Sequence, residues 1–437
     1  MASNEIVVFW FRRDLRLDDN NGLYNALRFG RKVLPIFIFD TSILDKLDHK
    51  CDRRVDFMFK ALEEMNLHLK QMHGSGIQYY YGKPLEVFAG LTSINNIIAV
   101  FCNEDYEPNA IERDVEVKKF LSAKGIRFNA FKDQVIFHKD EILKHDRKPY
   151  TVYTPYSKVW LEKFNQTDVE KFYSEKLLGN LVKFSPTNFE LASIGFENTD
   201  VVFKRPVVNE HLIGNYDNTR NLIYLPNGTS RLGVHLRFGT LSVRMVALKA
   251  LKYNLVYLKE LIWREFFMQV LRHFPHVEKS AFKSKYDNIK WENDEKLFER
   301  WCEGTTGYPA VDAGLRELNA TGFMHNRARM ITASFLTKHL LIDWRWGEAY
   351  FASKLLDFEL SSNNGNWQWV AGSGCDAAPY FRIFNPEEQQ KKFDPDFVYV
   401  KRWVHEFGTN NYSQPVVDHK MARHRALERF KSGVRNA

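Results

Sequence analysis

Two apolar runs near the start of the chain, IVVFWF at residues 6–11 and VLPIFIF at residues 33–39, indicate buried β-strands. After them, residues 52–72 and 110–123 carry apolar side chains at three- and four-residue spacing, which is typical of amphipathic helices. Further strand-like runs occupy residues 77–81, 97–101 and 126–131. This alternation predicts a parallel sheet with right-handed crossovers, so the first domain is expected to be α/β.

The first strand is not followed by GxGxxG, the glycine pattern that places a dinucleotide at a helix N-terminus. We therefore expect a Rossmann-like domain at residues 1–135 that does not hold NAD. Mixed polar and aromatic segments around Pro186 and Pro206 predict a connector, which we place at 136–210. Residues 211–437 are expected to form a mostly α-helical domain. Its helical patterns lie at 243–253, 255–272, 314–318, 327–341 and 347–356.

The composition excludes several classes of protein. No apolar run reaches the roughly 18 residues that a membrane-spanning helix needs. The N-terminus, MASNEIVVFWFRRD, lacks the segments of a secretion signal. The four cysteines lie far apart with no histidine at zinc-ligand spacing, so we expect neither disulfides nor a metal site. These features predict a cytoplasmic protein.

The net charge of +8 lies entirely in residues 211–437, which carry 32 basic and 24 acidic residues. A basic surface attracts polyanions, so this half is favoured for a nucleic-acid partner. Eight of the ten tryptophans also fall here, between Trp263 and Trp403. Core packing explains each tryptophan taken singly. Because indoles also stack on bases and lose an electron readily, their concentration suggests a redox site beside a base.

Two stretches place polar and aromatic residues on one face of a helix. Their residues are Glu260, Trp263, Arg264 and Phe267 in ELIWREFF, and Asn326, Arg329 and Met330 in MHNRARMI. Two such faces can line one cavity, although a solvated Glu–Arg pair is the simpler interpretation of the first. Thr229 and Ser230 precede a periodic stretch, where they either hold a phosphate or merely cap a helix. Asn363, in the turn-rich SSNNGNWQW, is also explained as a turn residue.

Seven motifs together closely resemble the photolyase/cryptochrome family, and within it the class I cyclobutane pyrimidine dimer photolyases. They are WFRRDLRLDDN, TSRLG, ELIWREF, GYPAVDAGLREL, MHNRARMITASFL, LIDWRWGEAYF and NNGNWQWVAGSGCDAAPYFRIFNP. The resemblance implies an α/β domain, a connector and a helical FAD-binding domain. It also implies a monomeric lyase for UV-damaged DNA, in which excited reduced FAD passes an electron to a flipped-out dimer.

The resemblance assigns residues to three sites. Those implied to contact FAD are Tyr216, Thr229, Ser230, Arg231, Leu232, Gly233, Arg264, Arg329, Asp357, Phe358, Glu359 and Asn363. Arg329 and Asp357 are expected to pair beside the flavin ring, with Asn363 at its N5 edge. The family often has Asp where this chain has Glu359. The residues implied to bind the dimer or DNA are Arg220, Glu260, Trp263, Phe267, Asn326, Arg327, Met330, Trp369 and Gln389.

The catalytic set implied by the resemblance is Trp367, Trp344 and Trp291 as an electron relay toward the surface, together with Asn363 and Glu260. A second, light-harvesting chromophore is expected in the N-terminal domain. Methenyltetrahydrofolate, a deazaflavin, a second flavin and an empty site all remain open, with Glu107 and Lys279 as the positions to test for a folate.

Two other activities remain open within the family. A 6-4 photolyase typically has histidines where this chain has Asn326 and Met330. A cryptochrome senses blue light without repairing DNA, and plant cryptochromes usually carry Asp at the position of Asn363; many also extend well beyond the helical domain, whereas this sequence stops at Ala437. Both differences favour the dimer photolyase.

Overall fold

The structure is a computed structural model that describes residues 5–435, and the chain divides into two compact units. The α/β unit contains the chain up to residue 141 together with residues 162–208 and 232–249. The helical unit contains residues 142–161, 209–231 and the chain from residue 250. The expected boundaries at 135 and 210 lie near two of these crossings and remain a prediction.

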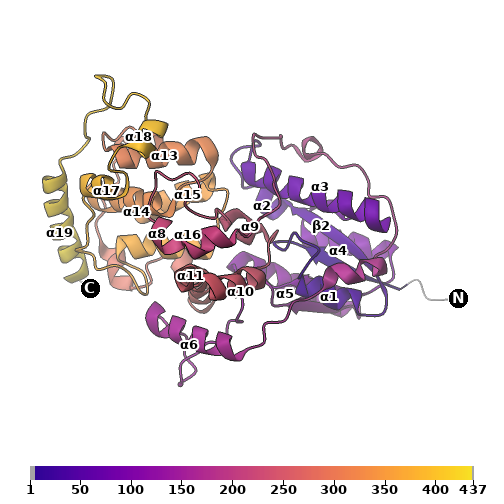
Figure 1. Ribbon diagram of the computed structural model, residues 1–437. Helices are drawn as coiled ribbons and strands as arrows, with labels where there is room; N and C mark the ends of the chain where they lie inside the picture. Colours follow the sequence, from indigo (N-terminus) through magenta and orange to yellow (C-terminus); the bar gives the residue numbers. More distant parts are fainter. Residues whose placement is uncertain (1–4, 436–437) are drawn as a thin grey trace. The chain divides into compact units, whose positions relative to one another are not determined.

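Five parallel strands form the sheet of the α/β unit, in the order β3-β2-β1-β4-β5 (Figure 1). The expected parallel α/β fold is confirmed. The strand order reverses beside β1, so the loop after β1 leaves the sheet at its topological switch point. The strands are β1 (Ile6–Phe11), β2 (Lys32–Asp40), β3 (Gln78–Gly82), β4 (Ile97–Asn103) and β5 (Arg127–Phe131).

Alternate side chains of the central strands point to one face of the sheet, where they form one half of the core of the α/β unit. Val8 and Trp10 of β1 are buried in the same cluster as Phe88 of α4 (Pro84–Ile94) and Val117 of α5 (Pro108–Ala123). The longest helix of the unit is α3 (Arg53–His73), capped by Asp52, whose side chain accepts from the backbone of Arg54. Side chains two apart on a strand share a face, so α4 and α5 cover a continuous apolar surface of the sheet.

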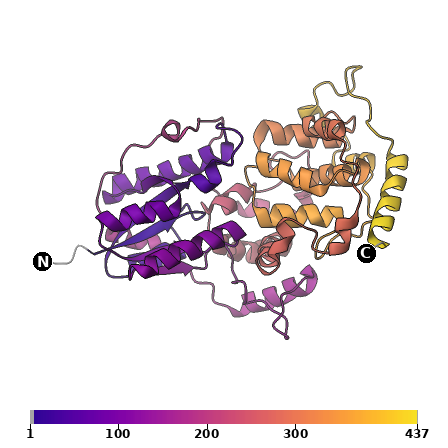
Figure 2. The ribbon, with the colours of Figure 1, turned by 180° about the vertical axis from the view of Figure 1, so that it is seen from behind.

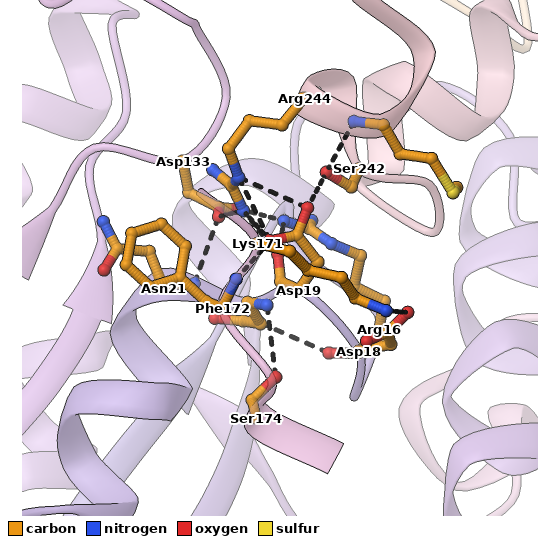
Figure 3. Close-up of polar contacts among 12 residues, drawn as sticks. Arg16, Asp18, Asp19, Asn21, Asp133, Lys171, Phe172, Ser174, Ser242 and Arg244 are labelled. Atoms are coloured by element: carbon orange, nitrogen blue, oxygen red, sulfur yellow. Dashed lines mark hydrogen bonds and ion pairs between the residues drawn. The ribbon is translucent and has the colours of Figure 1, made fainter. Parts of the chain in front are cut away.

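A buried ionic network ties residues 232–249 to the rest of the α/β unit (Figure 3). Arg244, at the start of α10 (Val243–Tyr253), donates to Asp133 at 2.9 Å and to Asp19 at 3.1 Å. Arg16 donates to the other oxygen of Asp133 at 2.6 Å, and Ser242 donates to Asp19. Burial alone raises the pKa of the Asp133 carboxyl, but the two guanidiniums hold it below its usual range. The network is balanced, with two cations and two anions.

The second unit is helical, and no β-strand follows β5 within the described residues (Figure 2). Its helices pack around a core that contains Trp301, Leu315, Trp344 and Trp367. The main elements are α11 (Leu255–His273), α12 (Glu295–Glu303), α13 (Pro309–Thr321), α14 (Asn326–Ser334), α15 (Trp344–Lys354), α16 (Leu360–Ala371), α17 (Pro386–Phe393), α18 (Val398–Trp403) and α19 (His419–Arg435). Within residues 5–435, no helix has the length and apolar character needed to span a bilayer.

The alternative interpretation of Asn363 as a turn residue is wrong, because this segment lies inside α16. Asn and Gly have low helix propensity, but tertiary contacts override it here. Asn364 Nδ2 donates to the carbonyl of Val277 at 2.9 Å. A Cβ at Gly365 would overlap the ring of Phe267, so the glycine allows α11 and α16 to approach closely. The residues that look like turn formers are therefore packing residues.

The helix expected at 327–341 is confirmed from Asn326 to His339, but it is not a regular α-helix throughout. The α-helix α14 ends at Ser334, and Phe335–His339 form one π-helical turn. This wider turn buries Lys338 completely, and its Nζ donates to the carbonyl of Ala371 at 2.8 Å. Helical periodicity counts only 3.6-residue turns, so it cannot anticipate such an interruption.

Candidate flavin and DNA site

Arg329 and Asp357 form an ion pair in the helical unit. Nη2 of Arg329 donates to the two carboxylate oxygens at 3.0 and 2.9 Å, while its Nε donates to the carbonyl of Met324 at 2.8 Å. Both side chains keep part of their surface exposed. The pair is thus held in one orientation, and its exposed edge is available to a ligand.

Asn363 is anchored by a neighbour that the sequence did not reveal. Its Nδ2 donates to the carbonyl of Glu348 at 3.0 Å and to Oε1 of the same residue at 2.8 Å. Burial raises the pKa of Glu348 to about 6, although the hydrogen bond from Asn363 opposes the shift. Glu348 lies on α15, and no local spacing connects it with a residue of α16. The geometry fixes which way the Asn363 amide faces.

Arg264 and Glu359 form a second ion pair, with 3.2 Å between Nη2 and Oε1. Ser362 Oγ donates to the other carboxylate oxygen of Glu359 at 3.0 Å. The Glu359 side chain is therefore engaged by other residues of the protein, and its carbonyl accepts from the backbone N–H of Asn363 at 2.9 Å. Phe358 packs partly buried against the core.

The TSRLG segment contributes two side-chain hydroxyls and one residue with an unusual backbone conformation. Ser230 Oγ lies 2.8 Å from the Tyr257 hydroxyl, whose ring meets that of Tyr216 edge-on at 5.0 Å. Thr229 is half-buried beside Ser230. Arg231 has φ of 51°, a left-handed conformation that non-glycine residues rarely adopt. Such strain commonly marks a ligand-binding segment. The next two residues, Leu232 and Gly233, fall in the α/β unit.

Three of the expected substrate residues line one small cavity of the helical unit: Trp263, Phe267 and Trp369. Tyr153, on α6 (Tyr153–Gln166), stacks flat on Trp263 with ring centroids 3.6 Å apart. Tyr153 lies far from ELIWREFF in the chain, so the sequence did not point to it. Helices α11 and α16 thus present two indoles and a phenyl ring to the same space.

Polar residues expected at the substrate are paired among themselves. Glu260 contacts Arg220 at 2.7 Å, and burial raises the pKa of its carboxyl despite this cation. Asn326 Nδ2 lies 3.8 Å from Met330 Sδ, which keeps these two side chains together on α14. The Glu260 carboxyl has lone pairs that can accept a hydrogen bond from a partner other than Arg220.

Arg327 and Gln389 each carry one polar atom that residues 5–435 leave unsatisfied. Arg327 Nη2 donates to Asn221 at 2.7 Å, and its guanidinium lies over the Phe393 ring at 4.3 Å. Arg327 Nε and Gln389 Oε1 are buried with no hydrogen-bond partner among the described residues. Unsatisfied buried groups of this kind are rare and commonly mark a ligand or water site.

The three tryptophans expected to form a relay lie in or beside one core. Trp367 and Trp344 are 2% exposed and share a buried cluster, while Trp291 is partly buried against it. Trp291 also meets Phe430 of α19 edge-on at 5.7 Å. Trp301, Trp346 and Trp403, for which only core packing was expected, contact the same cluster. Trp301 meets Trp367 edge-on at 6.2 Å and donates from Nε1 to the carbonyl of Thr332.

The two positions suggested for a folate fall in different units. Glu107, in the α/β unit, accepts from Arg13 at 2.9 Å and from Arg237 at 3.3 Å. Lys279, in the helical unit, offers its carbonyl to Arg345 Nε at 3.0 Å. Their role with a chromophore remains a prediction.

Family models account for most of the chain. A model described as DNA photolyase matches residues 7–174, and a model described as FAD binding domain of DNA photolyase matches residues 257–410. A deoxyribodipyrimidine photo-lyase from Synechococcus is 35% identical, covering 95% of this chain and 94% of the relative. The chain belongs to the DNA photolyase family. The homologous enzyme from Vibrio cholerae is 34% identical over 97% of this chain and 98% of its own.

Solved photolyase structures have the same fold as this family member. A bacterial class III photolyase from Agrobacterium tumefaciens superposes with a TM-score of 0.87 at 31% identity, covering 100% of this chain and 99% of its own. An archaeal photolyase from Sulfolobus tokodaii, solved with two FAD molecules, gives 0.83 at 32% identity, over 98% of this chain and 100% of its own. A Synechocystis cryptochrome gives 0.82 at 25% identity, over 97% of this chain and 99% of its own.

The residues of this photolyase-family chain fit FAD. Ser361 Oγ and Trp367 Nε1 of α16 are buried with no hydrogen-bond partner among residues 5–435, which suits a polar ligand beside this helix. The matched FAD-binding domain contains Arg264, Arg329 and Asn363. The hydroxyls of Thr229 and Ser230 precede it and have the chemistry to bind a diphosphate.

Proposed function

We propose that this photolyase repairs cyclobutane pyrimidine dimers in DNA under blue light and belongs to class I. The observation that carries the proposal is the similarity of nearly the whole chain to deoxyribodipyrimidine photo-lyases. Trp263, Phe267 and Trp369 support it, because they gather around one gap of about 20 Å³ between α11 and α16, which a base would have to widen. Flat aromatic side chains bind unstacked bases, at about 1–3 kcal/mol per base. Enzymes that act on a base within duplex DNA extrude it from the stack, and photolyases as a class work in this way.

The protein's own residues prepare the reaction. When bound, reduced FAD supplies the light-driven electron that splits the dimer and takes it back afterwards. Asn363, whose amide N–H is held by Glu348, would lie at the N5 edge of the bound flavin, and the Arg329–Asp357 pair would fix the electrostatic surroundings of the ring. Trp367, Trp344 and Trp291 are proposed to deliver electrons that keep the flavin reduced.

On the substrate side, Glu260 and Asn326 are proposed to hydrogen-bond the dimer's base edges while Trp263 and Trp369 stack on them. Arg220 and Arg327 are proposed to contact the DNA backbone with Gln389. The basic excess of residues 211–437 supports this arrangement, because phosphate contacts supply much of the affinity for DNA.

Blue-light sensing is the second candidate, favoured by the similarity to the Synechocystis cryptochrome. Repair of 6-4 photoproducts is disfavoured by Asn326 and Met330, where 6-4 enzymes typically carry histidines. A light-harvesting chromophore, a cytoplasmic location and a monomeric state stay predictions. The archaeal structure with two FAD molecules is consistent with a second flavin as one of the candidates.

One assay separates these functions. The purified protein is incubated with oligonucleotides that carry either a thymine dimer or a 6-4 photoproduct, in blue light and in darkness, and restored thymines are counted. We expect restoration only from the dimer and only in light. Restoration from the 6-4 substrate alone would support that enzyme, and no light-dependent restoration from either substrate would leave light sensing as the function.

A further inference from the structure

Tyr153 covers one face of the Trp263 ring. The two rings are parallel to within 6°, and their centroids lie 3.6 Å apart. Tyr153 is 8% exposed, whereas Trp263 is half-buried and lines the aromatic cavity between α11 and α16. A base that stacks on Trp263 must therefore use the face of the indole that Tyr153 leaves open.

The hydroxyl of Tyr153 is fixed to the same helix as Trp263. It donates to the main-chain carbonyl of Lys259 at 2.8 Å. Lys259 lies about one helical turn before Trp263 on α11. Burial raises the pKa of the Tyr153 hydroxyl, so this group remains a hydrogen-bond donor at neutral pH. Tyr153 thus contacts one turn of α11 through both its ring and its hydroxyl.

The main chain of Tyr153 contacts a second part of the cavity wall. Its backbone N–H donates to Oδ2 of Asp376 at 2.9 Å. Asp376 lines the aromatic cavity together with Trp369 and follows α16 in the chain. Tyr153 therefore joins the α11 wall, which carries Trp263, to the segment after α16.

Two further aromatic residues of α6 hold the helix against α11. Trp160 Nε1 donates to Glu265 Oε1 at 2.7 Å. Tyr156 packs against Phe266, with ring centroids 5.1 Å apart. Tyr156 and Trp160 are each 1% exposed. Because positions 153, 156 and 160 stand at i, i+3 and i+7, they share the face of α6 that meets α11.

We propose that Tyr153 is a positioning residue for the damaged base: it holds the Trp263 ring in the orientation in which that ring stacks on the flipped-out dimer. A side chain that is already ordered loses less conformational freedom when its partner arrives. The base therefore gains more from stacking on Trp263 than it would from a freely rotating indole. This inference rests on the proposed repair of dimers at the aromatic cavity, and it adds a residue of another helix to that site.

Equilibrium binding in darkness tests the role of the Tyr153 ring. The purified protein with its flavin is titrated with two duplexes of one sequence, of which one carries a thymine dimer and the other is undamaged. We expect Tyr153→Leu to weaken binding of the dimer duplex about three- to tenfold. Binding of the undamaged duplex should stay within about twofold of the parent, because phosphate contacts supply the non-specific affinity. A variant that is merely destabilised would lose affinity for both duplexes.

Two control variants separate the stacked ring from the rest of the segment. Tyr153→Phe keeps the ring and removes only the hydroxyl, so its affinity for the dimer duplex is expected within about twofold of the parent. Tyr150→Leu removes a ring from the same segment that meets Tyr156 edge-on at 6.2 Å. It should leave the preference for the dimer duplex unchanged.

Repair rates measured with chemically reduced flavin in blue light complete the test. Tyr153→Leu should restore thymines about three- to tenfold more slowly at subsaturating dimer duplex, yet reach the parent rate at saturating duplex. An unchanged preference in Tyr153→Leu, an equal loss in Tyr153→Phe or Tyr150→Leu, or a lower rate at saturation would overturn the inference and leave the proposed function intact. A parent protein without any preference for the dimer duplex would overturn both.

Discussion

Among single residues, Asn363 and Glu348 show how a side chain outside the motifs controls one inside them. The amide of Asn363 donates twice to Glu348, once to the carbonyl and once to the carboxyl. An amide that is held in this way cannot rotate freely toward a ligand. The N5-facing role expected of Asn363 therefore depends on a residue of another helix.

The raised pKa of Glu348 predicts a pH dependence of stability. Burial raises this pKa from 4.5 to about 6 in the folded protein. Below pH 4.5 the carboxyl is protonated in both states; stability is lost as the pH rises through 4.5 to 6, and the loss persists above. Glu348→Gln should therefore increase the free energy of unfolding at about pH 7.5, relative to about pH 4, on the order of 1 kcal/mol. Denaturant titrations at the two pH values measure this, and an equal change at both would contradict it.

The role proposed for Trp291 predicts that its substitution affects photoreduction of the flavin but not dimer repair. If it is the outer end of the relay, Trp291→Phe should slow photoreduction of oxidised FAD at least about tenfold, yet leave dimer repair unchanged once the flavin is reduced chemically. Trp403→Phe is the control, because Trp403 packs at the same core without an assigned role. Flash photolysis and a repair assay give the two rates. Repair lost even after chemical reduction would place Trp291 in another role.

At the level of elements, helices α11 and α16 form the aromatic cavity. The distance between these two helices depends on Gly365. A Cβ at this position would overlap the Phe267 ring. Gly365→Ala should destabilise the protein by about 1–3 kcal/mol through overpacking. Gly90→Ala in α4 is the matched control: nothing lies within 4 Å of its added Cβ, so better helix propensity should leave it neutral or up to about 1 kcal/mol more stable. Thermal unfolding of both variants makes the comparison, and equal melting temperatures would refute the packing argument.

Breaking the buried ionic network of the α/β unit is predicted to cost more stability than breaking an exposed ion pair. Asp133 is 2% exposed and contacts both Arg16 and Arg244. Asp133→Asn removes the shared anion and should cost about 3–5 kcal/mol, because two guanidiniums are left undercompensated. Asp200→Asn breaks the exposed contact with Arg53 and should cost less than about 1 kcal/mol. Urea unfolding distinguishes them; similar values for the two would show that burial does not set the cost.

Sequence periodicity predicted those elements in which the apolar residues keep one spacing throughout, as in the five strands and in α11. It failed at α16 and at the π-helical turn Phe335–His339, where tertiary contacts override local preference. For the site, the resemblance to the photolyase/cryptochrome family implied the Arg329–Asp357 pair, and the two side chains do form an ion pair. The motifs could not reveal Tyr153 on Trp263, or Glu348 beside Asn363, because those contacts join segments without a shared spacing.

For the whole molecule, family membership, a basic C-terminal half and an aromatic cavity together support light-driven repair of damaged DNA. The most direct test is the rate of thymine restoration in blue light, with chemically reduced flavin and subsaturating dimer-containing DNA. Trp369→Ala removes a ring from the cavity, whereas Trp346→Ala removes one that packs on the same core away from it. We predict a rate reduced at least about tenfold for Trp369→Ala and within about twofold of the parent for Trp346→Ala. Equal rates for the two variants, or restoration that proceeds in darkness, would contradict light-driven repair at this cavity.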